Sequence, residues 1–116
     1  MIWLLMMLAE TANGVVPESL FISRKEYKGC LTGQAMALEP SEASVDDIFA
    51  AAKTSCSKEW GDEYNEIVHY FQNRPPSPTG KNPETIALEM ISDQEDLVKG
   101  DIRLDILKLR AAKRRP

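Results

Sequence analysis

The chain contains two cysteines, Cys30 and Cys56, and their placement limits the fold more than any other feature. Each lies in a stretch whose apolar residues recur every three or four positions, which is typical of an amphipathic helix. Between the two stretches lies a polar turn with Pro40, which cannot continue a helix. We therefore expect two antiparallel helices, one from about 17 to 38 and one from about 45 to 73.

The second of these helices carries the stronger signals. Ser44 is a favourable N-cap, and Asp46 and Asp47 place negative charge in the first turn. Its apolar face consists of Val45, Ile48, Phe49, Ala52, Cys56, Trp60, Tyr64, Ile67, Val68 and Phe71. In the first helix, Gly29 and Gly33 each weaken helix formation, and we expect them to allow close approach of a neighbouring helix.

The two cysteines lie at similar distances from the turn along their helices, which favours a disulfide between them. Cys30 precedes the end of the first helix by eight residues, and Cys56 follows the start of the second by eleven. At 1.5 Å per residue both lie roughly 12 to 16 Å from the turn, on facing apolar stripes. A disulfide needs Cα atoms about 5.5 Å apart, which this arrangement permits. Two buried free thiols, or a catalytic or metal-binding pair, remain alternatives.

The remainder of the chain predicts further helices. Residues 74–83 contain four prolines and predict an extended loop, after which Asn82 and Pro83 open a third helix. Lys99–Gly100–Asp101 predicts a stop, followed by a last segment that reads as helix better than as strand. We therefore predict an all-α fold over 15–116 as a single small domain: a disulfide-stapled antiparallel helical hairpin plus one or two C-terminal helices.

The amino terminus indicates export. Residues 2–9 are apolar, too few to span a bilayer but suitable for the apolar region of a secretory signal, although no Lys or Arg precedes them. Ala12 and Gly14 then form the small-x-small pattern that signal peptidase recognises. We predict a signal peptide at 1–14, no integral membrane segment and a periplasmic or secreted protein. The alternative is a cytoplasmic protein whose first residues form a buried helical turn.

Motifs for chemistry are absent from the sequence. Two cysteines and one histidine, His69, provide no metal-ligand spacing, and there is no CxxC, glycine-rich phosphate loop, HExxH or GxSxG. His69 and Cys56 would lie roughly 20 Å apart on one long helix, which excludes a Cys–His pair there. We therefore predict no enzyme, no catalytic or metal-binding residues and no cofactor.

The charge pattern bears on partners. A net charge of −4 argues against a nucleic-acid binder, because phosphate contacts need a basic surface. Cations nevertheless gather at the carboxyl end, and we predict them as a contact for an unknown protein partner: Lys108, Arg110, Lys113, Arg114 and Arg115. If the last helices leave an apolar face exposed, we expect a homodimer.

The leader, a first helix with one cysteine, a Pro- and Ser-containing turn, and Ser44-x-x-Asp47 followed by AAAKTSC form a recognisable pattern. It resembles small uncharacterised exported helical proteins of Gram-negative bacteria that carry two cysteines. The resemblance covers about residues 1–71 and implies an exported hairpin with a disulfide and no known active site. We expect a non-enzymatic structural or interaction protein. A cytosolic regulatory protein with free thiols is the alternative, and a small Cys or His enzyme is the least supported.

Overall fold

The computed structural model describes residues 16–76 and 78–114. The predicted leader at 1–14 lies outside these residues. Within them the chain forms helices and no strand, in this order: α2 (Glu18–Leu38), the 3₁₀ turn η1 (Glu39–Ser41), α3 (Val45–Ser55), α4 (Ser57–Gln72) and α5 (Pro83–Lys113). The predicted all-α class is confirmed, and the last segment is helical. None of the described helices combines the length and apolarity needed to cross a membrane.

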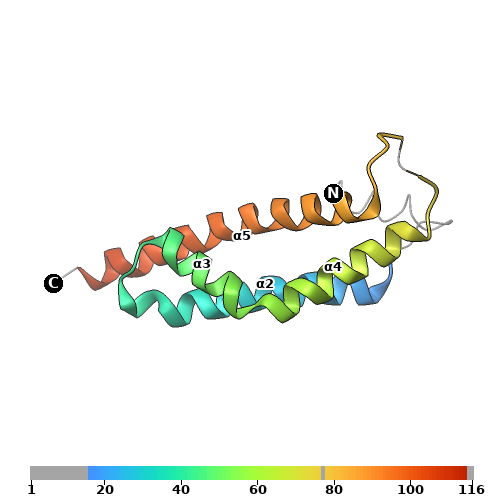
Figure 1. The fold of residues 1–116 in the computed structure, drawn as a ribbon. Coiled ribbons are helices and arrows are strands. Elements are labelled where there is room, and N and C mark those ends of the chain that lie inside the picture. Colours follow the sequence, from blue (N-terminus) through green and yellow to red (C-terminus); the bar gives the residue numbers. More distant parts are fainter. Residues whose placement is uncertain (1–15, 77, 115–116) are drawn as a thin grey trace.

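The helices form an elongated bundle of three antiparallel rods. Figure 1 shows α2 running in one direction, α3 and α4 together returning beside it, and α5 reversing once more after the proline-rich loop. The principal extents are 58 × 30 × 24 Å and the Cα radius of gyration is 17.0 Å. A compact domain of this length would have a radius of about 13 Å. The molecule is therefore a rod, and its core is a narrow strip along the axis.

Helix α2 matches the prediction for 17–38 within one residue. Its buried face repeats every three or four residues and consists of Leu20, Ser23, Tyr27, Leu31 and Ala35. The proposed role of Gly29 and Gly33 is wrong, because both are exposed and a Cβ at either position would meet nothing within 4 Å. These glycines lie on the solvent side of α2 and permit no helix contact.

The predicted second helix is divided at Cys56. Ser44 caps α3 as expected, since its hydroxyl accepts a hydrogen bond from the Asp47 amide at 3.1 Å. At Cys56 the backbone leaves the helical region, with φ −103° and ψ 25°. Ser55, Cys56 and Ser57 all have modest helix propensity, so the break occurs where it costs little. The apolar stripe continues across it, and α3 and α4 act as one bent rod.

The predicted disulfide is present and closes the hairpin. Cys30 of α2 and Cys56 at the α3–α4 junction are bonded at 2.05 Å, with Cα atoms 6.0 Å apart. Cys56 is fully buried within the core, and Cys30 packs against that core from a partly exposed position. The two helices therefore meet at matching heights, as the residue counts from the turn indicated.

Helix α5 is a single helix, and the predicted stop at Lys99–Asp101 is wrong. Asn82 caps it through a 2.8 Å hydrogen bond from the Thr85 amide, with Pro83 in the first turn. Its buried stripe crosses Gly100 without interruption and consists of Ala87, Ile91, Gln94, Val98, Ile102 and Ile106. A helical glycine costs about 1 kcal/mol. Burial of a Val and an Ile on either side contributes more than this, so the helix continues.

Reduction of the disulfide tests its contribution to stability. Cys30 and Cys56 are 26 residues apart, and closing such a loop in the unfolded chain stabilises the fold by about 3.5 kcal/mol. We expect urea unfolding of the reduced protein to show a free energy lower by that amount. A Cys30→Ala/Cys56→Ala variant is the control, because a reductant should leave its unfolding curve unchanged. An equal response in both proteins would contradict the prediction.

Candidate functional site

A groove lies at one end of the rod, where the proline-rich loop joins α4 to α5. It has a volume of about 490 Å³. Its walls combine aromatic, aliphatic and proline side chains with two cations: Tyr70, Phe71, Arg74, Pro75, Pro76, Pro78, Lys81, Pro83 and Ile86. A second hollow on this loop, of about 410 Å³, is continuous with the groove in its lining, since both include Phe71, Arg74, Pro76, Lys81 and Pro83.

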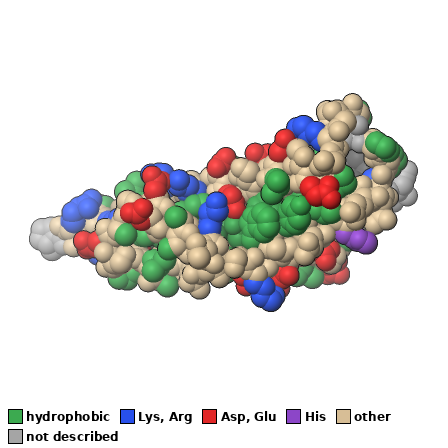
Figure 2. Space-filling view, in the orientation of Figure 1, with side chains coloured by type: hydrophobic (Ala, Val, Ile, Leu, Met, Phe, Trp, Pro, Cys, Tyr) green, Lys and Arg blue, Asp and Glu red, His purple; other side chains and the backbone are tan. Residues whose placement is uncertain are grey.

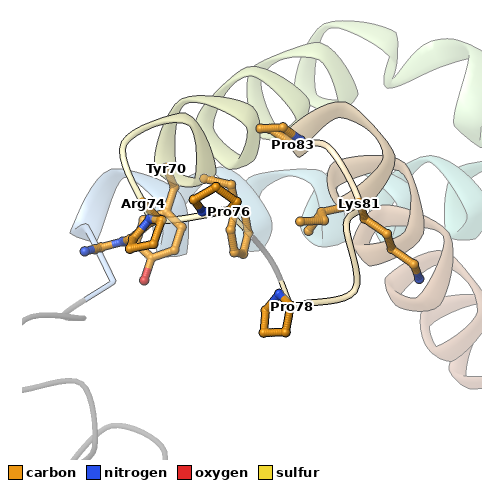
Figure 3. Close-up of a pocket in the computed structure, with 9 residues that line it drawn as sticks. Tyr70, Arg74, Pro76, Pro78, Lys81 and Pro83 are labelled. Carbon is orange, nitrogen blue, oxygen red and sulfur yellow. The ribbon is translucent and has the colours of Figure 1, made fainter.

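Local contacts hold the groove open. The Arg74 guanidinium lies 4.3 Å from the centre of the Tyr70 ring, and Tyr70 meets Phe71 edge-on at 5.0 Å. Figure 3 shows Tyr70 and Arg74 on one side of the groove and Lys81 on the other, with Pro76 and Pro78 on the loop between them. A 2.7 Å ion pair from Lys81 to Glu89 ties the loop to the first turns of α5.

The lining suits an apolar ligand with a negative group. Rings and prolines offer a dehydrated surface, and prolines in a loop lose little freedom when they bind. Two cations at the margin favour a carboxylate.

A polar cluster lies inside the bundle, close to the disulfide. Glu63 of α4 is fully buried, and its Oε2 atom lies 3.2 Å from an Arg24 guanidinium nitrogen. The Gln94 amide donates to the Arg24 carbonyl oxygen at 3.0 Å. The Tyr27 hydroxyl donates a hydrogen bond to Glu95 at 2.5 Å, and Glu95 also forms an ion pair with the exposed Lys53 of α3. The cluster therefore connects all three rods.

Burial changes the protonation of this cluster. It raises the pKa of Glu63 from 4.5 to about 7, because removal from water outweighs the nearby Arg24 cation, while the Glu95 charge adds to the shift. Burial and the hydrogen bond to Glu95 raise the pKa of Tyr27, which therefore stays protonated. Gln94 lowers the Glu63 pKa through a side-chain hydrogen bond, but this effect is smaller than that of burial. Glu63 thus changes charge near neutral pH inside the core.

A third hollow borders this cluster without containing its centre. It lies between α3 and α5, measures about 550 Å³, and is lined by Asp46, Phe49, Ala50, Lys53, Thr54, Ser92, Glu95, Asp96 and Lys99. Of the cluster, only Lys53 and Glu95 line it. Asp46 forms an ion pair with Lys99 at 2.8 Å and a longer one with Arg103 at 3.4 Å. The Lys99 pair, and then the Arg103 pair, hold the pKa of Asp46 below its usual value. Several charged side chains of the lining already form ion pairs with one another, so few of them are available to bind a ligand.

The cysteines and the histidine are placed away from reactive surroundings. Ligand atoms of Cys30, Cys56 and Glu59 lie within 4.8 Å of one another, but both sulfurs are in the disulfide and are not metal-binding thiolates. His69 is exposed near the end of α4, where its carbonyl oxygen accepts a hydrogen bond from Asn73 at 2.8 Å.

The predicted cationic contact divides into two groups. Arg110 donates to the Glu39 and Ala43 carbonyl oxygens at 3.3 and 2.8 Å, and Lys113 bonds the Glu39 carboxylate at 2.6 Å. The Lys113 bond and then Arg110 hold the pKa of Glu39 below its usual value, against a smaller effect of burial. These two cations close the end of the bundle. Lys108 and Arg114 are exposed, and Arg115 lies outside the described residues.

The space-filling view agrees with this division. Figure 2 shows acidic side chains interspersed with basic ones toward the carboxyl end, and hydrophobic side chains gathered where α5 passes α4. The visible face has no continuous basic field of the kind that a polyanion requires.

The sequence contained a signal for the polar cluster that motif searching does not detect. Gln94 occupies an apolar position of the α5 stripe, and Glu63 follows Cys56 by seven residues, which returns it to the same helix face. Polar residues at stripe positions predict burial. Their partners, Arg24 and Glu95, come from other helices and could not be paired without the fold.

Comparison with known proteins gives no assignment. The chain matches no known protein family, no curated protein and no solved structure.

Replacing Glu63 tests its protonation. Ionisation of Glu63 costs more in the folded protein than in the unfolded chain, so wild-type stability falls as pH rises from 4.5 toward 7. Glu63→Gln does not titrate. We expect the free energy of unfolding of the variant relative to wild type to increase by about 3 kcal/mol from about pH 4 to about pH 8. Urea unfolding across this range measures the difference.

The control is Glu89→Gln, which makes the same replacement at an exposed position of α5. A constant difference between Glu63→Gln and wild type at every pH would mean that Glu63 titrates normally.

Proposed function

We propose that the protein is a non-enzymatic protein exported to the periplasm or the cell exterior, where it acts by binding another protein. The Cys30–Cys56 disulfide carries this proposal. Disulfides persist in oxidising compartments and are rare in the reducing cytosol. The bond also joins the two helices on which the bundle is built, so the fold benefits directly from such a compartment.

The surroundings of the reactive groups support a non-enzymatic role. Both cysteines are engaged in the disulfide, and Glu63 is enclosed in the core with no exposed side-chain surface. The groove at the proline-rich loop brings together rings, prolines and cations. Such groups recognise a ligand through shape and charge.

The groove at the end of the rod is the surface that we propose for the partner. An extended segment could pack an aromatic or aliphatic side chain between Phe71 and the loop prolines. An acidic group on that segment would then lie near Arg74 and Lys81. The cations at the carboxyl end play a smaller role than the sequence suggested, because Arg110 and Lys113 stabilise the bundle itself.

The mass of the chain recovered from a Gram-negative cell tests export. Expression of residues 1–116 should yield a periplasmic protein that lacks residues 1–14 and two hydrogens. An Ala12→Lys variant is the control, because a charged residue in the small-x-small pattern blocks cleavage. A cytoplasmic chain that retains residues 1–14 and two free thiols would instead indicate the cytosolic alternative.

Site-specific photo-cross-linking tests the binding surface. We expect p-benzoylphenylalanine at Pro76, in the groove, to form one discrete adduct with another protein in the periplasm. The matched control places the same residue at Lys58, whose side chain is 81% exposed on α4 outside the groove. Adducts of equal yield from both positions, or none from Pro76, would contradict a partner site in the groove.

A further inference from the structure

The outer side of α5 carries an apolar seam that the bundle does not use. It consists of Leu97, Gly100, Leu104, Leu107 and Ala111, and all five are exposed. Leu97 is 74% exposed, and Leu104 and Leu107 are each 53% exposed. These three leucines are among the most exposed large apolar side chains of the described residues.

The spacing of the seam is that of a coiled coil. Its members follow one another by three, four, three and four residues, a mean of 3.5, which keeps a straight line of contacts between two supercoiled helices. A residue two positions away on a helix is turned by about 200°. Leu104 therefore faces away from Ile102 and Ile106, which are buried in the bundle. Helix α5 thus has two separate apolar faces, one already covered and one open.

The charges beside the seam change sign along the helix. Toward its amino end the exposed flanking residues are acidic, and toward its carboxyl end they are basic: Asp96 and Asp101, then Arg103 and Lys108. Asp93 and Arg114 continue the line of the seam at its two ends with the same change of sign, and Arg103 also lies 3.4 Å from Asp46 of α3. A surface with this gradient is complementary to the same surface turned end for end.

We propose that two copies of this chain associate through these seams as an antiparallel coiled coil. With the two-fold axis near residue 102, Leu97 of one copy packs beside Leu107 of the other. Leu104 enters the space opposite Gly100 of the second copy, where a Cβ would meet nothing within 4 Å in the single chain. The missing side chain of Gly100 thus provides the hole for a leucine knob.

The flanking charges decide the orientation. In a parallel pair, Asp96 would lie beside Asp101 of the second copy, and Arg103 beside Lys108, so both flanking pairs would repel. In the antiparallel pair the acidic half of each seam lies along the basic half of the other. Asp101 and Arg103 meet their own counterparts at the axis, which limits the affinity.

The size of the seam sets the expected strength. From Leu97 to Ala111 it extends about 21 Å, which is short for a stable interface. We therefore expect a dimer that dissociates on dilution through the micromolar range. The proposal is independent of export and of the groove, because the seam lies on another part of the surface.

Sedimentation velocity over a range of concentrations tests the association. We expect the oxidised wild-type protein to change from monomer to dimer, and Leu104→Glu to stay monomeric under the same conditions. Leu88→Glu is the matched control: Leu88 is 50% exposed on the same helix but lies off the seam, so this variant should still dimerise. Leu97→Lys, at the most exposed position, provides a second disrupting variant if Leu104→Glu fails to fold.

A wild-type protein that remains monomeric at the highest concentration reached would overturn the proposal. A Leu88→Glu variant that loses dimers as fully as Leu104→Glu would do the same.

Cross-linking tests the orientation. Under mild oxidation, a mixture of Leu97→Cys and Leu107→Cys proteins should form a covalent heterodimer, whereas Leu97→Cys alone should not. Covalent dimers from Leu97→Cys alone would show a parallel pair and contradict the antiparallel arrangement.

Discussion

The disulfide between Cys30 and Cys56 is the constraint on which the rest of the bundle depends. It joins α2 to the second rod at the point where that rod bends, so one bond sets both the height at which the helices meet and the place where α3 gives way to α4. The second rod must bend there to keep its apolar stripe on α2 and α5 at once. The bond thus secures the least regular part of an otherwise regular fold.

The polar cluster lies close to this disulfide. The narrow core therefore contains polar contacts in this region as well as the apolar contacts along the helices. Arg24 and Tyr27 precede Cys30 by two turns or fewer, and Glu63 follows Cys56 by two turns. A rod-shaped bundle has few fully enclosed positions, and this one places the Glu63 carboxyl group in one of them. Buried ionic groups cost desolvation energy and specify which side chains may meet. Displacement of α4 along α2 would separate Glu63 from Arg24 and leave a buried carboxyl group without its partner.

Much of the fold could be predicted from the sequence, and the misses have physical causes. The helix class, the Ser44 cap and the disulfide follow from local patterns, because periodicity, capping and residue counts from a turn are local quantities. The break at Cys56 and the passage of α5 through Gly100 were missed. Low helix propensity allows the break inside an apolar stripe that continues across it, whereas at Gly100 packing against the bundle overrides propensity. Glu63 was missed because its position on the stripe can be seen in the sequence, but its partner Arg24 cannot.

The position of the cross-link has a consequence for how the molecule opens. The bond closes a ring from Cys30 to Cys56 and leaves α5 outside it, attached through the proline-rich loop, side-chain packing and polar contacts to α2 and η1. Separation of α5 from the bundle would keep the covalent ring closed, but it would expose the buried stripe of α5 and break these contacts. That step would wet Glu63 and release its proton at neutral pH. Protonation of Glu63 and packing of α5 against the bundle are thus coupled in one local equilibrium.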